Sequence, residues 1–234
     1  MSDILKIDKL NQFYGESHTL WDVDLDIAKG KCTCLMGRNG VGKTTLLECI
    51  MGLLPVKSGD ISFNGDSLNK VIAERRAPLG IGYVPQGRQI FPMLTVEENL
   101  RIGLPARKDK SSDIPAFIFE LFPVLKEMLG RRGGDLSGGQ QQQLAIGRAL
   151  VIEPTMLILD EPTEGIQPNI VQEIGDIVLR LNRERGLTVL LVEQKLPFAR
   201  KVADHFCILD RGRNVATGRM PDLNEEIIKQ YLTV

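Results

Sequence analysis

The residues best suited to chemistry lie in a glycine-rich run that ends in lysine and threonine. The pattern G-x-x-x-x-G-K-S/T is matched at every fixed position by Gly37-Arg38-Asn39-Gly40-Val41-Gly42-Lys43-Thr44. Glycines let successive backbone N–H groups face an anion, and a following helix N-terminus adds a favourable dipole. Lys43 can reach the β- and γ-phosphates of a nucleotide, and the Thr44 hydroxyl can ligate Mg²⁺. We therefore expect this run, with Thr45 directly after it, to bind ATP and Mg²⁺ rather than to be a chance turn.

Two adjacent acids form the second group of candidate residues. Asp160 and Glu161 follow the apolar run 156–159, which is typical of a strand buried on both faces of a parallel sheet. They would then lie at the carboxyl end of that strand, where α/β sheets bind ligands. Asp160 suits an outer contact to Mg²⁺, and Glu161 suits a general base or a residue that positions the attacking water. The two acids could also merely end a strand before Pro162, but the phosphate loop favours the catalytic interpretation.

The elements that must position these residues can be predicted from apolar patterning. Apolar runs predict strands at 5–13, 20–27, 32–36, 61–64, 81–84, 156–159 and 188–192, and a hairpin joining 206–210 to 214–217. Periodic runs predict helices at 44–53, 95–102, 115–121, 125–129, 141–151, 169–185 and 223–232. The first two strands are amphipathic, which suits an antiparallel layer with one face in water. The glutamines at 141–143 are expected to form a solvated first helical turn.

This pattern indicates an α/β fold with a mostly parallel central sheet, an antiparallel β layer and an inserted helical subdomain. At 234 residues the chain suits a single domain with a full hydrophobic core. Helical patterns dominate from residue 87 to residue 135, where Gly133-Gly134 closes the segment as a flexible joint. We therefore expect 1–86 and 136–234 to form the core and 87–135 to form the inserted subdomain.

Composition excludes several classes of protein. The net charge is −1 and 43% of residues are hydrophobic, so nothing suggests a nucleic-acid partner. No apolar run approaches the ~18 residues of a membrane span, and the first ten residues lack a signal-peptide layout, so we expect a cytosolic protein. With only two histidines in the chain, the four cysteines are expected to be buried thiols rather than metal or disulfide residues: Cys32, Cys34, Cys49 and Cys207.

A third motif, Leu136-Ser137-Gly138-Gly139-Gln140, occurs in a much smaller range of proteins than a phosphate loop, which many nucleotide enzymes carry. It lies between the phosphate loop and the acidic pair, and the three motifs together resemble the ATP-binding subunits of ABC transporters over essentially the whole chain. The resemblance implies the P-loop ABC ATPase fold and a machine in which two ATPase subunits close around ATP. It also implies that Ser137, Gly138, Gly139 and Gln140 grip the γ-phosphate held in the partner subunit's site. Small residues before a helix N-terminus can form such an anion site.

The resemblance assigns roles to two further residues. Tyr14 matches the aromatic residue that stacks on adenine, although it could also be a packed strand aromatic. Gln86, in Tyr83-Val84-Pro85-Gln86-Gly87, matches the Q-loop glutamine that links Mg²⁺ to the helical subdomain.

Two positions depart from the usual pattern of the family. Gln194 stands where a histidine normally follows the strand 188–192, and Gln167 replaces the usual aspartate after the acidic pair. Both departures resemble the importers of branched-chain amino acids and urea. A glutamine amide can donate to a γ-phosphate oxygen and accept from water, and glutamine orients the attacking water in some GTPases. The expected catalytic set is therefore Lys43, Gln86, Glu161 and Gln194, with Thr44, Gln86 and Asp160 at the metal.

The finer resemblance is to the urea-import ATPase subunit, with branched-chain amino acid import as the alternative. It rests on the runs 85–92, 136–148 and 160–168. It implies two integral membrane permease subunits, a second ATPase subunit that is the same or different, and a periplasmic or lipid-anchored solute-binding protein. The chain would then lie peripherally on the cytoplasmic face of the inner membrane.

The phenylalanines near the helical segment leave two interpretations open. They could form the segment's own small core, or line a groove that receives a short helix of a membrane subunit. These side chains are Phe91, Phe117, Phe119 and Phe122.

Two other functions compete with transport. DNA-repair ABC ATPases would carry a very long coiled-coil insertion, and translation forms usually carry two ATPase domains, and this chain has neither. A weakly hydrolysing regulatory module is suggested by Gln167 and Gln194, but Glu161 argues against it.

Overall fold

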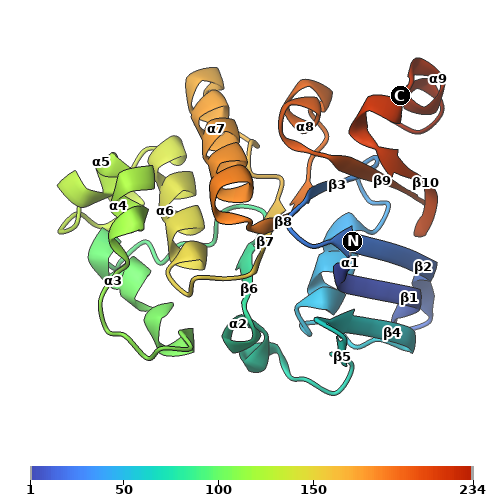
Figure 1. The fold of residues 1–234 in the computed structure, drawn as a ribbon, viewed down its shortest axis with the longest axis horizontal. Coiled ribbons are helices and arrows are strands. Elements are labelled where there is room, and N and C mark those ends of the chain that lie inside the picture. The colour runs from blue at the N-terminus through green and yellow to red at the C-terminus, as the bar shows by residue number, and fades with distance from the viewer. Residues whose placement is uncertain (1, 233–234) are drawn as a thin grey trace.

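The computed structural model describes residues 2–232 and arranges them as two sheets with helices packed around them (Figure 1). Within those residues the smaller sheet is antiparallel, with the strand order β2-β1-β4-β5. Its strands largely alternate buried and exposed side chains, so the predicted antiparallel layer with one wet face is confirmed. The bounds are β1 (Asp3–Tyr14), β2 (Ser17–Ala28), β4 (Ser58–Phe63) and β5 (Asp66–Ser67).

The larger sheet has the order β10-β9-β3-β8-β7-β6 within the described residues. All of its neighbouring strands are parallel except β9 and β10, which form the predicted antiparallel hairpin. Every residue of β3, β7 and β8 is buried, as continuous apolar runs require. The bounds are β3 (Cys32–Met36), β6 (Ile81–Val84), β7 (Met156–Asp160), β8 (Thr188–Val192), β9 (His205–Asp210) and β10 (Arg213–Arg219).

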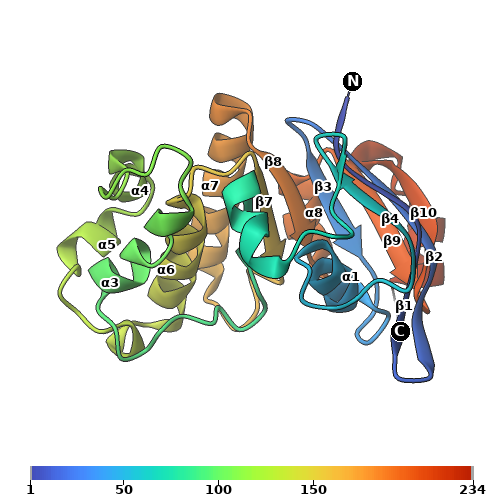
Figure 2. The same cartoon turned by 90° about the horizontal axis from the view of Figure 1, so that it is seen from below.

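This parallel sheet separates two hydrophobic cores. Leu35, Ile158 and Leu190 pack into the core shared with helix α1 (Lys43–Ile50) and the antiparallel sheet. The neighbouring positions of the same strands, such as Cys34 and Leu157, point to the opposite face of the sheet and pack into the core shared with the helices there. In Figure 2, α1 lies between β3 of the parallel sheet and the strands β1, β2 and β4 of the antiparallel sheet. All four cysteines are free and buried, as expected.

Helices cover the parallel sheet and extend beyond one end of it. Figure 1 places α3, α4 and α5 at the opposite end of the molecule from β1, β2 and β4. Two short helices, α2 and α8, had no strong periodic signal and were not predicted. The bounds are α1 (Lys43–Ile50), α2 (Arg76–Leu79), α3 (Val96–Arg101), α4 (Ala116–Leu121), α5 (Pro123–Glu127), α6 (Gly138–Leu150), α7 (Pro168–Arg185), α8 (Leu196–Val202) and α9 (Glu225–Tyr231).

The prediction of solvated glutamines at the start of α6 was wrong. Gln142 is 4% exposed and Gln143 is 2% exposed. Helix α6 packs against α3 and α5 and also against β6, so its first turns are enclosed instead of facing water. The helix also begins earlier than predicted, because Ser137 caps it.

The segment 87–135 contains α3, α4, α5 and short 3-10 turns, and no strand. Phe122 is fully buried in the core that also holds Val84 and Leu157, whereas Phe91 is 46% exposed. The segment's apolar side chains are thus continuous with the core of the sheet, and the division of the chain into a core and an inserted subdomain stays a proposal. No helix formed by residues 2–232 is long and apolar enough to cross a membrane.

Candidate nucleotide-binding site

The glycine-rich run forms the loop between β3 and α1. Gly37 has φ 144°, and a Cβ there would lie 2.3 Å from the carbonyl oxygen of Leu209. Gly42 has φ 106°, and a Cβ there would lie 2.8 Å from a methyl group of Leu20. Both the backbone conformation and the close approach of neighbouring elements therefore require glycine at these two positions.

Lys43 is the first residue of α1, and its ammonium group is turned into the loop. Its Nζ donates to the carbonyl oxygens of Gly37 and Arg38, both at 2.9 Å, and lies 3.9 Å from Oε1 of Glu161. Burial lowers the pKa of Lys43, while the charges of Glu161 and Asp160 oppose that shift. The loop thus concentrates a cation and a helix N-terminus at one point, an arrangement suited to phosphate.

Thr44 and Asp160 meet beside this loop. The Thr44 hydroxyl donates to Oδ2 of Asp160 at 3.1 Å. Burial raises the pKa of Asp160 to about 6, against the lowering effect of the Thr44 hydrogen bond. Oδ1 of Asp160 is buried and has no hydrogen-bond partner among the described residues. An orphaned carboxylate oxygen beside a hydroxyl is a donor set that fits Mg²⁺, which takes few protein ligands besides phosphate oxygens and water.

Glu161 holds its carboxylate between two glutamines. Its Oε1 accepts from Nε2 of Gln194 at 2.6 Å, and its Oε2 accepts from Nε2 of Gln86 at 3.3 Å. The backbone at Glu161 has φ 48°, and its N–H donates to the carbonyl of Val192 on the neighbouring strand. A left-handed non-glycine residue fixed by its surroundings is a common feature of functional sites.

Gln194 lies at the phosphate loop, where the sequence placed it. Its Nε2 also donates to Oδ1 of Asn39 at 2.6 Å. The buried Glu193 positions it, because one carboxylate oxygen accepts from the backbone N–H groups of Gln194 and Lys195, and the other from the Thr163 hydroxyl. Sequence reasoning missed Glu193, although its place directly after a buried strand is the signal that identified Glu161.

Part of this set, including Lys43, Thr44 and Glu161, lines a cavity of about 430 Å³. Tyr14 reaches it from the end of β1, is 47% exposed, and places its hydroxyl 3.5 Å from Oγ1 of Thr45 and 3.3 Å from Glu48. Two lining residues, Thr19 and Glu164, were not among the predicted site residues. The lining consists of Tyr14, Thr19, Asn39, Gly40, Gly42, Lys43, Thr44, Thr45, Gln86, Glu161 and Glu164.

The remaining predicted residues lie outside this lining, and they include Gly37, Arg38, Asp160 and Gln194. Ser137 is the N-cap of α6, and its hydroxyl accepts from the N–H of Gln140, whose side chain accepts from the N–H of Ser137. Ser137 is exposed, so the start of α6 is open to a second molecule. Gly138 and Gly139 form the first turn of the same helix, and Val41 is buried in the core below the phosphate loop.

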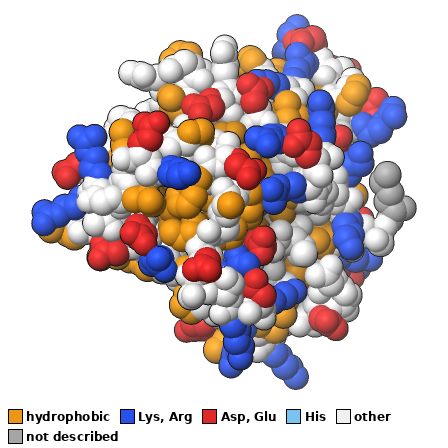
Figure 3. All heavy atoms as spheres, turned by 60° about the vertical axis from the view of Figure 1, so that its left-hand side comes forward, with side chains coloured by type: hydrophobic (Ala, Val, Ile, Leu, Met, Phe, Trp, Pro, Cys, Tyr) orange, Lys and Arg blue, Asp and Glu red, His pale blue; other side chains and the backbone are white. Residues whose placement is uncertain are grey.

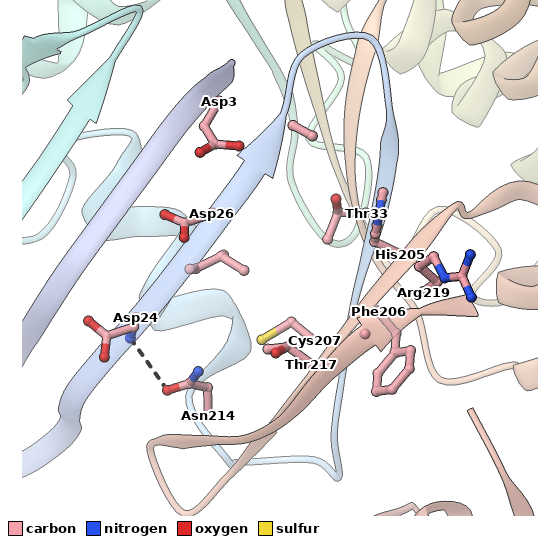
Figure 4. Close-up of a pocket in the computed structure, with 13 residues that line it drawn as sticks. Asp3, Asp24, Asp26, Thr33, His205, Phe206, Cys207, Asn214, Thr217 and Arg219 are labelled. Carbon is pink, nitrogen blue, oxygen red and sulfur yellow. Dashed lines mark hydrogen bonds between the residues drawn. The ribbon is translucent and has the colours of Figure 1, made fainter. Parts of the chain in front are cut away.

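A second cavity, of about 440 Å³, lies between β2 and the β9–β10 hairpin (Figure 4). Asp3, Asp24 and Asp26 line one wall, where the N–H of Asp24 donates to Asn214. Three carboxylates repel phosphate, so this cavity does not compete as the nucleotide site.

A phosphate loop, a hydroxyl and carboxylate pair, and a carboxylate poised beside the loop define a P-loop nucleotide hydrolase. A model described as ABC transporter matches residues 20–164, and the chain belongs to this family as an ATP-binding, ATP-hydrolysing subunit. It is 42% identical to the high-affinity branched-chain amino acid transport ATP-binding protein BraG of Pseudomonas aeruginosa, over 98% of this chain and 99% of that one.

Two solved structures resemble the fold closely. One is a nucleotide-free ATP-binding cassette from an ABC transporter, with a TM-score of 0.84, 30% identity, and coverage of 99% of this chain and 95% of that one. The other is a dimeric ATP-binding cassette bound to ADP and Pi, with a TM-score of 0.82, 25% identity, and coverage of 92% and 98%.

Proposed function

We propose that this chain hydrolyses ATP at its own phosphate loop to power an ABC importer. The observation that carries this proposal is the position of Glu161, whose carboxylate lies within reach of Lys43, Gln86 and Gln194. Glu161 would accept a proton from the attacking water or orient it, and Gln194 would orient the same water. The phosphate loop would hold the β- and γ-phosphates, and Tyr14 would stack on adenine.

Mg²⁺ would be held by Thr44 and Asp160, with Gln86 nearby. When bound it would neutralise charge on the phosphate oxygens. The orphaned oxygen of Asp160 supports this assignment. No group of three or more His, Cys, Asp or Glu that could hold a metal occurs in residues 2–232, which suits an ion bound mainly through substrate phosphates and water.

We infer that the active form is a dimer of ATPase subunits. Ser137, Gly138 and Gly139 are absent from the lining of this chain's own cavity, while the N-terminus of α6 offers backbone donors at an exposed position. A second subunit, identical or different, would supply the signature to this chain's site and receive this chain's signature in return. The dimeric relative bound to ADP and Pi supports this arrangement.

The end of the molecule that carries α3 to α5 would bind two integral membrane permease subunits. Figure 3 shows apolar side chains gathered on this face. Phe91 is 46%, Met93 is 70% and Ile102 is 45% exposed, which suits a groove for a short helix of the permease. The γ-phosphate would shift Gln86 and so rotate the groove. The chain would then act peripherally at the cytoplasmic face of the inner membrane.

Branched-chain amino acids are the solute that we favour. The BraG relative is named for their transport and matches this chain from end to end. Urea is the second candidate, because the runs 85–92, 136–148 and 160–168 resemble the urea-import subunits. Either solute would be delivered by a periplasmic or lipid-anchored binding protein.

Uptake by the complete complex tests this function. The complex is purified from its source cells, reconstituted into vesicles, and assayed for uptake of radiolabelled leucine and radiolabelled urea with and without ATP. We expect ATP-dependent uptake of leucine that Lys43→Ala abolishes. Uptake of urea alone would reassign the solute, and uptake of either solute without ATP would contradict the ATPase role.

A further inference from the structure

The loop after β6 has an unusual backbone. Three consecutive residues are left-handed, with φ 74° at Gly87, 70° at Arg88 and 45° at Gln89. Such a conformation is strained for the two non-glycine residues and persists only where the surroundings fix it. The loop directly follows Gln86, the residue that lines the nucleotide cavity.

The side chain of Arg88 connects this loop to the start of α6. Its Nη1 donates to Oε1 of Gln141 at 3.3 Å. A Cβ on Gly138 would lie 3.3 Å from both terminal nitrogens of the same guanidinium. Arg88 therefore covers the first turn of the signature helix, and glycine at 138 leaves the space for it.

The same guanidinium reaches the segment that follows the catalytic acid. Nη2 of Arg88 donates to the carbonyl oxygen of Glu164 at 3.4 Å. The carboxylate of Glu164 in turn accepts from Nε2 of Gln86 at 2.9 Å. Glu164 is thus held at its side chain by Gln86 and at its backbone by Arg88, two residues of one loop.

A second arginine fixes the loop from the last turn of α6. Nη2 of Arg148 donates to the carbonyl oxygen of Gln89 at 2.8 Å and lies 3.5 Å from that of Arg88. Its guanidinium also stacks over the ring of Phe91 at 5.1 Å. The strained loop is therefore hydrogen-bonded to both ends of one helix, so a shift of the loop alters contacts at both ends of α6.

We propose that Arg88 is a positioning residue that transmits the state of this chain's own phosphate site to its signature, and hence to the ATP site on the partner's phosphate loop. This proposal rests on the proposed function above. A displacement of Gln86 or Glu164 by nucleotide moves the loop, and Arg88 passes that movement to the helix that begins at Ser137. The guanidinium suits this role because its two terminal nitrogens contact Gln141 and Glu164 separately, in a fixed planar geometry that a lysine does not provide.

Complexes with only one working ATP site separate this role from a general one. In the first arrangement this chain carries Glu161→Gln, so its own phosphate loop still binds ATP, but only the site built on the partner's phosphate loop and this chain's signature hydrolyses it. In the second, the partner's phosphate-loop lysine is replaced, so only this chain's own phosphate loop works. ATP turnover is measured in each with Arg88, Arg88→Ala or Arg88→Lys.

We expect Arg88→Ala to reduce ATP turnover in the first arrangement by at least about tenfold, which is the scale of effect of a misplaced reacting group. In the second arrangement ATP turnover should fall by less than about twofold. Arg88→Lys should reproduce part of this loss. Gln141→Ala, which removes the acceptor for Arg88 on α6 together with a hydrogen bond from Gln141 to the carbonyl of Gly133, should show the same bias. Arg183→Ala, at an exposed position of α7, is the matched control and should change neither arrangement. If Arg88→Ala does not fold, Gln141→Ala carries the test.

Equal losses in both arrangements, a larger loss in the second, or no loss in either would overturn the role of Arg88. A wild-type complex without ATP turnover would instead refute the proposed function itself, so the two failures are distinguishable.

Discussion

Lys43 and Glu161 occupy positions that ATP must change. In the structure Lys43 donates to two carbonyl oxygens of its own loop, and Glu161 accepts hydrogen bonds from Gln86 and Gln194. A bound γ-phosphate would attract the ammonium of Lys43 and the amide of Gln194. Under the proposed function the carboxylate of Glu161 would then be free to act on water, so these contacts would belong to a resting arrangement of the site.

Gln194 leads to a prediction about pH. A glutamine amide does not titrate, whereas histidine does so near pH 6.5. At saturating Mg²⁺ and ATP, the wild-type complex should show no histidine-dependent limb in its turnover between about pH 6 and 8. Gln194→His should acquire such a limb. Identical pH profiles of ATP turnover for the two proteins, both with a limb near about pH 6.5, would contradict this prediction.

The sequence predicted some site residues better than others. Lys43 and Asp160 followed from motifs whose chemistry is evident from residue types alone, and Gln194 needed a family resemblance because a lone glutamine carries no chemical signal. Glu164 and Glu193 were missed, because their roles depend on hydrogen bonds between loops that are distant in sequence.

Helix α6 begins with the residues that the proposed function assigns to a second subunit's ATP site. Its capping box between Ser137 and Gln140 satisfies two N–H groups of its first turn, while its glycines pack beneath Arg88 and Ile170. The helix therefore presents a preformed N-terminus at a place where this chain's own nucleotide cavity does not reach.

A signature substitution should therefore leave this chain's own nucleotide binding intact. Ser137→Arg should change the affinity of the isolated chain for ATP by less than about twofold, because the new side chain lies outside the cavity, while Lys43→Ala should weaken it strongly. Titration with a fluorescent ATP analogue measures both. Loss of nucleotide binding in Ser137→Arg would contradict this division of labour.

The aspartates on one wall of the second cavity lead to a prediction about Asp26, in β2. Burial and then the charge of Asp3 raise the pKa of Asp26 above its ordinary value of 3.8. The folded protein therefore holds this proton more tightly than the unfolded chain, and the contribution of Asp26 to stability falls as pH rises above 3.8.

Asp26→Asn should then increase the free energy of unfolding at pH 7 slightly, because Asp26 is exposed and solvent screens its charge, and the difference should vanish near about pH 3. Urea denaturation of the two proteins at both pH values measures it. Asp66→Asn, at an exposed position of the same sheet, is the control. A destabilised Asp26→Asn protein at pH 7 would show that the acid wall is not repulsive.

Among the helices and strands, the long elements with a clear apolar period were predictable from the sequence. Short helices, and the burial of polar residues on an enclosed helix, were not. Strand β7 and helix α7 carry strong patterns, so apolar runs were sufficient to find them. Helix α8 has only seven residues, and its formation depends on packing against α7. Gln142 and Gln143 were misjudged because composition does not reveal that α6 is packed on several sides.

For the whole molecule, the central point of the proposed function is that one chain would contribute residues to two different ATP sites. Lys43, Thr44 and Glu161 line one cavity, whereas Ser137 to Gly139 begin a helix outside it. The family was recognisable from the order of three motifs in the sequence. The solute was not, because an ATPase subunit need not touch the molecule that is transported.

The most direct test is steady-state ATP turnover by the assembled complex with wild-type chain and with Glu161→Gln. The substitution keeps the shape of the side chain and removes the carboxylate that would act on the attacking water. We expect turnover at this chain's site to fall by at least about 100-fold while ATP binding is retained. Turnover close to that of the wild-type complex, with the partner's phosphate-loop lysine replaced so that only this site contributes, would contradict the account.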